Sequence, residues 1–72
     1  MLGNPKFKEQ QMVSFSIEEN GEMKKYDGVV YVVDPNGTSE QTEEPSYDIE
    51  VFFGGKVELF KHIRESQVTE RA

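Results

Sequence analysis

The chain has 72 residues, one histidine and no cysteine, and its fourteen acidic residues outnumber eight basic ones. A chain of this length forms a single small domain, and without cysteine it has neither a disulfide nor a thiolate metal cluster. The lone histidine argues against a structural zinc site. The formal charge of −6 disfavours binding to duplex DNA, because affinity for DNA comes largely from neutralising phosphates.

The hydropathy of the chain predicts a cytoplasmic protein. Residues 1–10 contain no apolar run of the length that a secretory signal needs. No segment approaches the roughly 20 consecutive apolar residues of a membrane-spanning helix. The absence of cysteine fits a reducing compartment. We therefore expect neither export nor membrane insertion.

The first predicted strand covers residues 11–19, in which apolar side chains alternate with polar ones. Asn20 and Gly21 follow, the pair favoured in a type I′ hairpin turn because both central residues need positive φ. A two-residue turn pairs Phe15 with Tyr26 on one face, but it also places two glutamates opposite each other. A looser loop is therefore an alternative.

The second predicted strand, residues 22–34, ends in the five-residue apolar run 29–33. Consecutive β-branched residues favour a strand, yet five successive side chains cannot share one face. Either both faces are covered, or the strand bends at Gly28 and changes faces through a bulge. The second interpretation is favoured, and it places Tyr31 on the outside. The pattern DPNG at residues 34–37 then predicts a turn.

Residues 38–45, TSEQTEEP, form a polar and acidic loop that contains no apolar side chain of the core-forming type. Such a segment is not expected to contribute to the core. In a domain this small, the loop is either flexible filler or a binding element.

The third predicted strand, residues 46–53, leads into a glycine pair whose turn decides the register of the second hairpin. A two-residue turn places Val51 opposite Glu58 on the core face, whereas a three-residue loop over 54–56 places it opposite Leu59. The second register keeps apolar residues together, so we predict a G1-type bulge with a glycine in the left-handed region. The predicted core comprises Tyr47, Ile49, Val51, Val57, Leu59, Ile63 and Val68.

A fourth strand is predicted from residue 57 to residue 60 or 61, a single helical or 3₁₀ turn over 62–66, and a final short strand over 67–69. Five short strands with one such turn before the last are typical of an all-β fold of the SH3-like barrel type. An OB-type barrel is the alternative, although it usually needs more residues and a true helix, and no such helix is visible.

The predicted domain organisation is a single small β-barrel domain over residues 1–72. Its ordered core covers residues 7–69, with the acidic loop 38–45 exposed and both termini flexible. Phe7 is predicted to tuck under the edge of the barrel as part of an N-terminal lead-in strand.

Three segments resemble a known group of proteins: FSIEENGEMKKYDGVVYVVD, PSYDIEV and LFKHIRESQV. Together they resemble small uncharacterised proteins carried by phages and prophages of Gram-positive bacteria. The most specific part is the tail from Leu59 to Val68, and the resemblance extends over roughly residues 7–68. It implies a fold more than an activity, because no function is established for such proteins.

The residue types needed for catalysis are present but carry no pattern. General acid–base or nucleophilic catalysis needs a convergent set of side chains such as Ser–His–Asp. His62, Ser66, Asp48 and Glu65 supply these types, but their spacing marks no site. A barrel this small also has little room for a pocket. We therefore predict a protein that is not an enzyme, with no catalytic residue, cofactor or metal ion.

Nucleic-acid binding is the alternative function, because Lys61, His62 and Arg64 form a local basic patch. Phe52 and Tyr31 are aromatic side chains of the kind that stack on bases. The same basic residues can instead pair with nearby acids, and the net negative charge favours that interpretation.

Protein binding is the favoured function. Small barrels with surface aromatics and a long acidic loop commonly bind peptides or sheet edges. Tyr31 and Phe52 are the predicted contact residues, and the surface around them includes Lys61, His62 and Arg64. The predicted charged rim comprises Glu40, Glu43 and Glu44. The sequence thus predicts a non-enzymatic interaction module for an unidentified protein partner. A homodimer is an alternative, because exposed aromatics also suit self-association.

Overall fold

The computed structural model describes residues 4–71 and shows an all-β protein with five antiparallel strands in one sheet. The elements are β1 (Met12–Glu19), β2 (Glu22–Asp34), β3 (Ser46–Phe53), β4 (Lys56–Arg64), the 3₁₀ turn η1 (Glu65–Gln67) and β5 (Val68–Glu70). The strands are ordered β4-β3-β2-β1-β5 in the sheet. The predicted all-β fold with five strands and a 3₁₀ turn before the last is confirmed.

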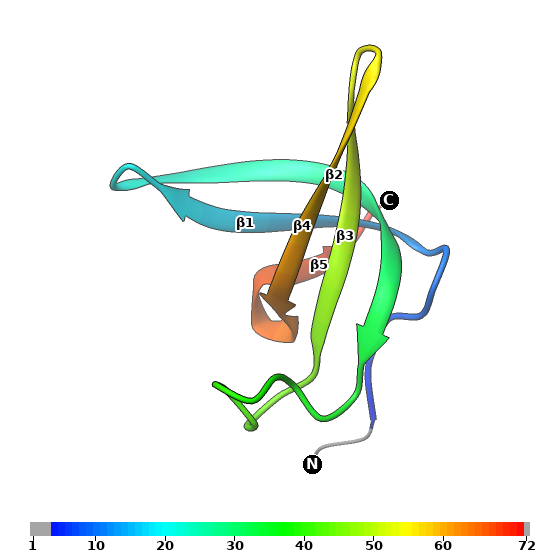
Figure 1. The fold of residues 1–72 in the computed structure, drawn as a ribbon, viewed down its shortest axis with the longest axis vertical. Coiled ribbons are helices and arrows are strands. Elements are labelled where there is room, and N and C mark those ends of the chain that lie inside the picture. The colour runs from blue at the N-terminus through cyan, green and yellow to red at the C-terminus, as the bar shows by residue number, and fades with distance from the viewer. Residues whose placement is uncertain (1–3, 72) are drawn as a thin grey trace.

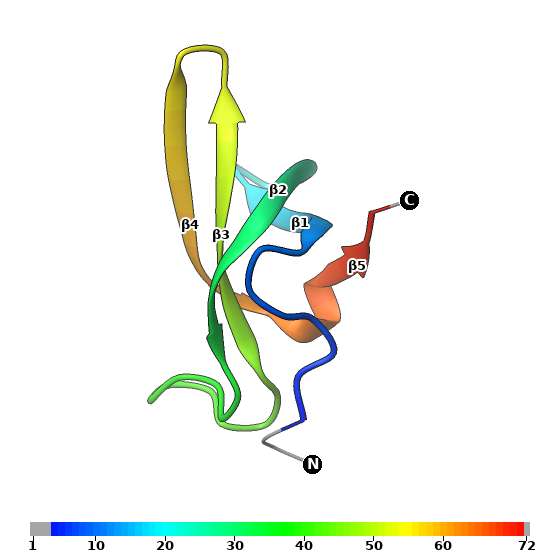
Figure 2. The ribbon, with the colours of Figure 1, turned by 90° about the vertical axis from the view of Figure 1, so that its right-hand side faces the viewer.

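The sheet is strongly twisted, and as a result the β1–β2 hairpin runs across the β3–β4 hairpin (Figure 1). The loop between β2 and β3 lies at one end of the molecule, and the turn between β3 and β4 lies at the other (Figure 2). In the described part of the chain, no helix is long and apolar enough to cross a membrane.

The first hairpin forms with the tight turn that its sequence favours. Asn20 and Gly21 both have positive φ, 53° and 82°, and Phe15 lies opposite Tyr26. Glu19 does lie opposite a second glutamate, but Lys24 Nζ is 3.9 Å from its Oε1 atom, and Tyr26 donates a hydrogen bond of 2.6 Å to the same atom. These two partners offset the repulsion, so the looser loop is not needed.

The second strand changes faces through a bulge, as predicted. The pairing with β3 shifts between Val30 and Val32, which leaves Tyr31 as the extra, exposed residue. The bulge therefore lies at Tyr31, three positions beyond Gly28. Gly28 instead allows close packing, because a Cβ atom there would lie 2.5 Å from the Glu50 carbonyl oxygen.

The predicted register of the second hairpin is wrong. Phe53 pairs with Lys56 and Val51 with Glu58, so the turn has two residues and no G1 bulge. Gly54 alone of the glycine pair has positive φ, 59°, which is the pattern of a type II′ turn. The apolar–charged pairs cost little, because Lys56 and Glu58 project near the hairpin tip, where both side chains are exposed.

A bulge does occur in β4, but it lies at Lys61 and His62 and not at the turn. Tyr47 pairs with Ile63 and Ile49 with Phe60, so Lys61 and His62 together lie opposite one residue of β3. His62 takes the left-handed conformation with φ 60°. The bulge restores the inward direction of Ile63, which the two-residue turn would otherwise have reversed.

The register error moves two residues out of the predicted core. Val57 is 55 % exposed and Leu59 is 36 % exposed, on the face away from the core. The buried apolar residues are Val13, Phe15, Val30, Tyr47, Ile49, Val51, Ile63 and Val68. Full burial of each such side chain contributes about 1.5–3 kcal/mol before entropic costs.

The C-terminal elements begin later than predicted. Pairing with β3 extends β4 to Arg64, so the 3₁₀ turn covers Glu65–Gln67 instead of 62–66. The last strand is Val68–Glu70, one residue beyond the predicted 67–69. The Gln67 side chain donates to the Ser16 carbonyl oxygen at 2.9 Å, which fixes the turn against β1.

Phe7 packs on the core as predicted, but residues 4–11 form no strand, so the expected lead-in strand is absent from this segment. The Phe7 ring meets the Tyr47 ring edge-on, with centroids 5.6 Å apart. Backbone hydrogen bonds of 2.9 Å join Gln10 and Gln11 to Val30. The termini predicted to be flexible include residues 1–3 and 72, which lie outside the described residues.

Candidate interaction surface

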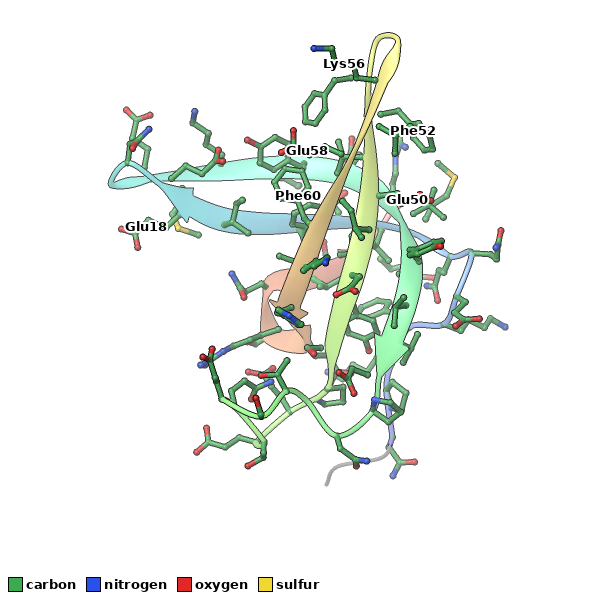
Figure 3. All side chains as sticks on the ribbon, in the orientation of Figure 1. Glu18, Glu50, Phe52, Lys56, Glu58 and Phe60 are labelled. Carbon is green, nitrogen blue, oxygen red and sulfur yellow. The ribbon has the colours of Figure 1, made fainter. Side chains whose placement is uncertain are left out.

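Phe52, a predicted contact residue, lies on the outer face of the sheet. Phe52 and Glu50 project to one side of the β3–β4 hairpin, and Glu58 and Phe60 project to the other (Figure 3). This alternation follows from the pleat, and Phe60 packs against the core. The side chain of Phe52 is 61 % exposed and lies opposite Val57 of β4.

A row of side chains crosses four strands on the same outer face. Met12 lies opposite Val29, Val29 opposite Glu50, and Glu50 opposite Leu59. Directly opposite residues of antiparallel neighbours project to the same face. Together with the pair on β3 and β4 they form a surface that we call the outer patch: Met12, Val29, Glu50, Phe52, Val57 and Leu59. Adjacent exposed apolar side chains of this kind mark interaction sites more often than isolated ones do.

Two of the three predicted basic residues lie close to carboxylates. Lys61 and His62 lie opposite Asp48, whose Oδ1 atom accepts a 3.0 Å hydrogen bond from the His62 backbone N–H. His62 also lines an open depression of about 480 Å³ together with Asp34, Thr38, Ser39 and Glu40. Arg64 is exposed at the end of β4. The acids around His62 oppose the approach of a phosphate.

The acidic loop makes hydrogen bonds within itself and to η1. The Thr38 N–H donates to the Gln41 carbonyl oxygen at 2.8 Å. The Gln41 side-chain amide donates to the Glu44 carbonyl oxygen, and its Oε1 atom accepts the N–H groups of Glu43 and Glu44. Glu44 accepts the Ser66 N–H at 2.7 Å and the Ser66 hydroxyl at 3.1 Å. Of the three glutamates in the predicted rim, Glu44 therefore holds the loop to η1, whereas Glu40 and Glu43 are exposed.

An aromatic cluster fills the inner corner between the two hairpins. The Tyr26 ring centroid lies 5.0 Å from that of Phe60 and 5.9 Å from that of Phe53. The Tyr26 hydroxyl donates to Glu19, and this hydrogen bond raises the pKa of Tyr26, with smaller contributions from burial and from the charges of Glu19 and Glu58. The cluster extends the core toward the hairpin arms and stabilises their crossing.

The serine, histidine and aspartate considered for catalysis, Ser66, His62 and Asp48, are not joined side chain to side chain by hydrogen bonds in residues 4–71. The Ser66 hydroxyl bonds Glu44, and Asp48 bonds the backbone of His62, so no hydrogen bond within residues 4–71 joins a hydroxyl to the imidazole. Within the same residues, no group of three or more His, Asp or Glu side chains is placed to hold a metal ion.

Several members of the outer patch were missed from the sequence. Val57 and Leu59 were predicted as core because the three-residue loop turned them inward. Met12, Val29 and Glu50 carry no motif, and only the pairing of four strands brings them together. A strict two-residue Gly-Gly turn would have predicted part of the outer patch, since it places Phe52 opposite Val57. Tyr31 is exposed as predicted, at the β2 bulge.

No protein-family model, curated protein or solved structure matches this chain.

Proposed function

We propose that this protein is a non-enzymatic interaction module whose outer patch binds a protein partner. The observation that supports the proposal is the outer patch, in which Phe52, Val57 and Leu59 are exposed next to one another on a face that the core does not use. Burying such side chains against a partner contributes a favourable binding free energy of about 25 cal/mol per Å² of apolar surface removed from water. We further propose that the module works in the cytoplasm, that its sheet follows the SH3-like plan, and that it is related to proteins of phages or prophages.

Crosslinking from the patch tests this function in the cells that produce the protein. A photoreactive phenylalanine analogue replaces Phe52 in one variant and Met23 in a matched control. Met23 is 68 % exposed, but it lies near the tip of the β1–β2 hairpin, outside the outer patch. We expect a discrete adduct from position 52 that is absent from position 23.

A second substitution shows whether that adduct depends on the patch. Adding Leu59→Ala to the position-52 variant removes an apolar neighbour on β4 without adding charge, and we expect a clearly weaker adduct while circular dichroism stays unchanged. Equal adducts from positions 52 and 23, or an adduct that Leu59→Ala leaves unchanged, would contradict the proposed function.

A further inference from the structure

The outer patch contains one charged side chain, and that residue indicates what binds there. Glu50 lies between Val29 on β2 and Leu59 on β4. It is half-buried, whereas Glu18 and Glu58 are exposed. Figure 3 shows Glu50 beside Phe52, with Glu58 on the opposite side of the hairpin and Glu18 far away on the other hairpin.

Glu50 has no cationic partner in the described part of the chain. Among residues 4–71, the ion pairs are Lys24 with Glu19 and Arg71 with Asp27, and no side-chain hydrogen bond involves Glu50. Asp27, an acid of the same outer face, is thus paired where Glu50 is not. A partner that covers the patch removes water from this carboxylate, and a cation on the partner compensates that loss more strongly than a neutral hydrogen-bond donor does.

We propose that the outer patch binds a cationic segment of a partner protein, with Glu50 as the ion-pair partner of a lysine or arginine that is flanked by apolar side chains. This inference rests on the proposed function and specifies the chemistry of the partner. The apolar groups of the segment pack on Phe52 and its neighbours, and the cation fixes the register on Glu50. The net charge of −6 also favours the approach of a basic segment.

A second copy of the chain is the less suitable occupant. Two copies joined through the same patch would bury two Glu50 carboxylates, and no patch residue is basic. Each copy also carries a net charge of −6, so association brings like charges together. The unpaired carboxylate therefore favours a different, basic partner.

Three short labelled peptides test the inference on the full chain. The first interleaves leucine with arginine, the second has glutamate in place of each arginine, and the third has alanine in place of each leucine. Binding is measured by fluorescence anisotropy at low and at physiological salt. Amide chemical shifts map the contact. We expect only the leucine–arginine peptide to bind well, with shifts centred on residues 50–59, and its affinity to fall as salt rises.

Matched variants isolate the contribution of Glu50. We expect Glu50→Gln to weaken binding of the leucine–arginine peptide about fivefold, as loss of a partly desolvated charge pair does. Glu18→Gln and Glu58→Gln make the same change of charge away from the patch, and each should change the affinity less than twofold. Phe52→Ala removes an apolar contact without adding charge, and it should weaken binding about tenfold.

The outcomes separate this inference from the proposed function. If the glutamate peptide binds as well as the arginine peptide, or Glu50→Gln has no effect, the cationic partner is wrong while crosslinking at position 52 still supports the interaction surface. Equal binding of the alanine peptide, shifts centred on the depression around His62, or no binding of any peptide would also overturn it. Light scattering that shows a dimer lost in Phe52→Ala would identify a second copy as the occupant instead.

Discussion

At the scale of single residues, Tyr47 joins segments that lie far apart in the sequence. Its side chain is fully buried on β3, and its hydroxyl donates to Glu65 Oε2 at 2.8 Å and accepts the Phe7 N–H at 3.3 Å. The same Glu65 oxygen accepts the Lys6 N–H at 2.9 Å. Burial, followed by the hydrogen bond to Glu65, raises the pKa of Tyr47 to about 12.

This raised pKa predicts a loss of stability at alkaline pH. The folded state favours the neutral phenol of Tyr47. The contribution of this group to the free energy of unfolding is therefore fully present below its unfolded pKa of 10.0, and it is lost as pH rises through its folded pKa of about 12. Urea unfolding should therefore show a falling free energy of unfolding across that range. In Tyr47→Phe the slope due to this group should disappear, while the free energy at neutral pH drops by about 1–2 kcal/mol because the Phe7 N–H and Glu65 lose a partner. The same alkaline slope in Tyr47→Phe would contradict the assignment.

His62 shows how a residue can be present in the sequence without revealing its role. The histidine was predicted from its type to belong to a basic surface or to a helical turn. In the structure the backbone of His62 forms the β4 bulge: it adopts φ 60°, and its N–H donates a hydrogen bond to Asp48. Only the pairing of β4 with β3 requires that conformation, so the sequence alone could not assign it.

At the scale of elements, the β2–β3 contact depends on the missing side chain of Gly28. A Cβ atom at this position would lie 2.5 Å from the Glu50 carbonyl oxygen and 2.7 Å from Ile49 Cγ2. These distances are too short for real contacts, and the backbone oxygen cannot rotate away. The two strands approach as closely as they do because residue 28 is glycine.

Gly28→Ala is therefore expected to lower the free energy of unfolding by about 2–3 kcal/mol, as overpacking in a well-packed sheet does. Gly55→Ala is the matched control, because no atom lies within 4 Å of its added Cβ and its φ is not positive. That variant should change stability by less than about 0.5 kcal/mol. Equal effects of the two substitutions in urea unfolding would show that the close approach of β2 and β3 is not what requires glycine.

The two hairpins show where local sequence suffices to predict an element. The Asn-Gly turn and the alternation around it gave the correct pairing of Phe15 with Tyr26, because turn and strand preferences agree there. At the Gly-Gly turn the two preferences conflict. Matching apolar residues required a bulge at the turn, whereas the chain keeps a tight turn and places its bulge at Lys61 and His62. The position of a compensating bulge is set by contacts with the core, which the local sequence does not contain.

At the scale of the whole molecule, the charge of −6 is compensated by few contacts. Within residues 4–71 the ion pairs are Lys24 with Glu19 at 3.9 Å and Arg71 with Asp27 at 4.0 Å, both at the surface. Surface pairs of this kind contribute at most about 1 kcal/mol each. Repulsion among the remaining acids should therefore destabilise the folded state slightly.

Raising the salt concentration from low to physiological should increase the free energy of unfolding by about 0.5 kcal/mol, because salt screens this repulsion. Thermal unfolding at constant pH measures the effect. Glu43→Lys, at an exposed loop position, reduces the net charge and should make the salt dependence smaller. A midpoint that falls as salt rises would mean that attractive pairs outweigh the repulsion. Salt should act in the opposite direction on binding of the leucine–arginine peptide.

The sequence by itself determined the class of fold, the five strands, the first hairpin and the exposure of Phe52 and Tyr31, because these follow from alternation and turn chemistry within a few residues. The tertiary structure alone decided the outer patch. Met12, Val29, Glu50 and Leu59 come from four strands, and their common face depends on the registers of three strand pairs. A shift of one residue in any register reverses the direction of the side chains, and the packing of the opposite face against the core selects among those registers.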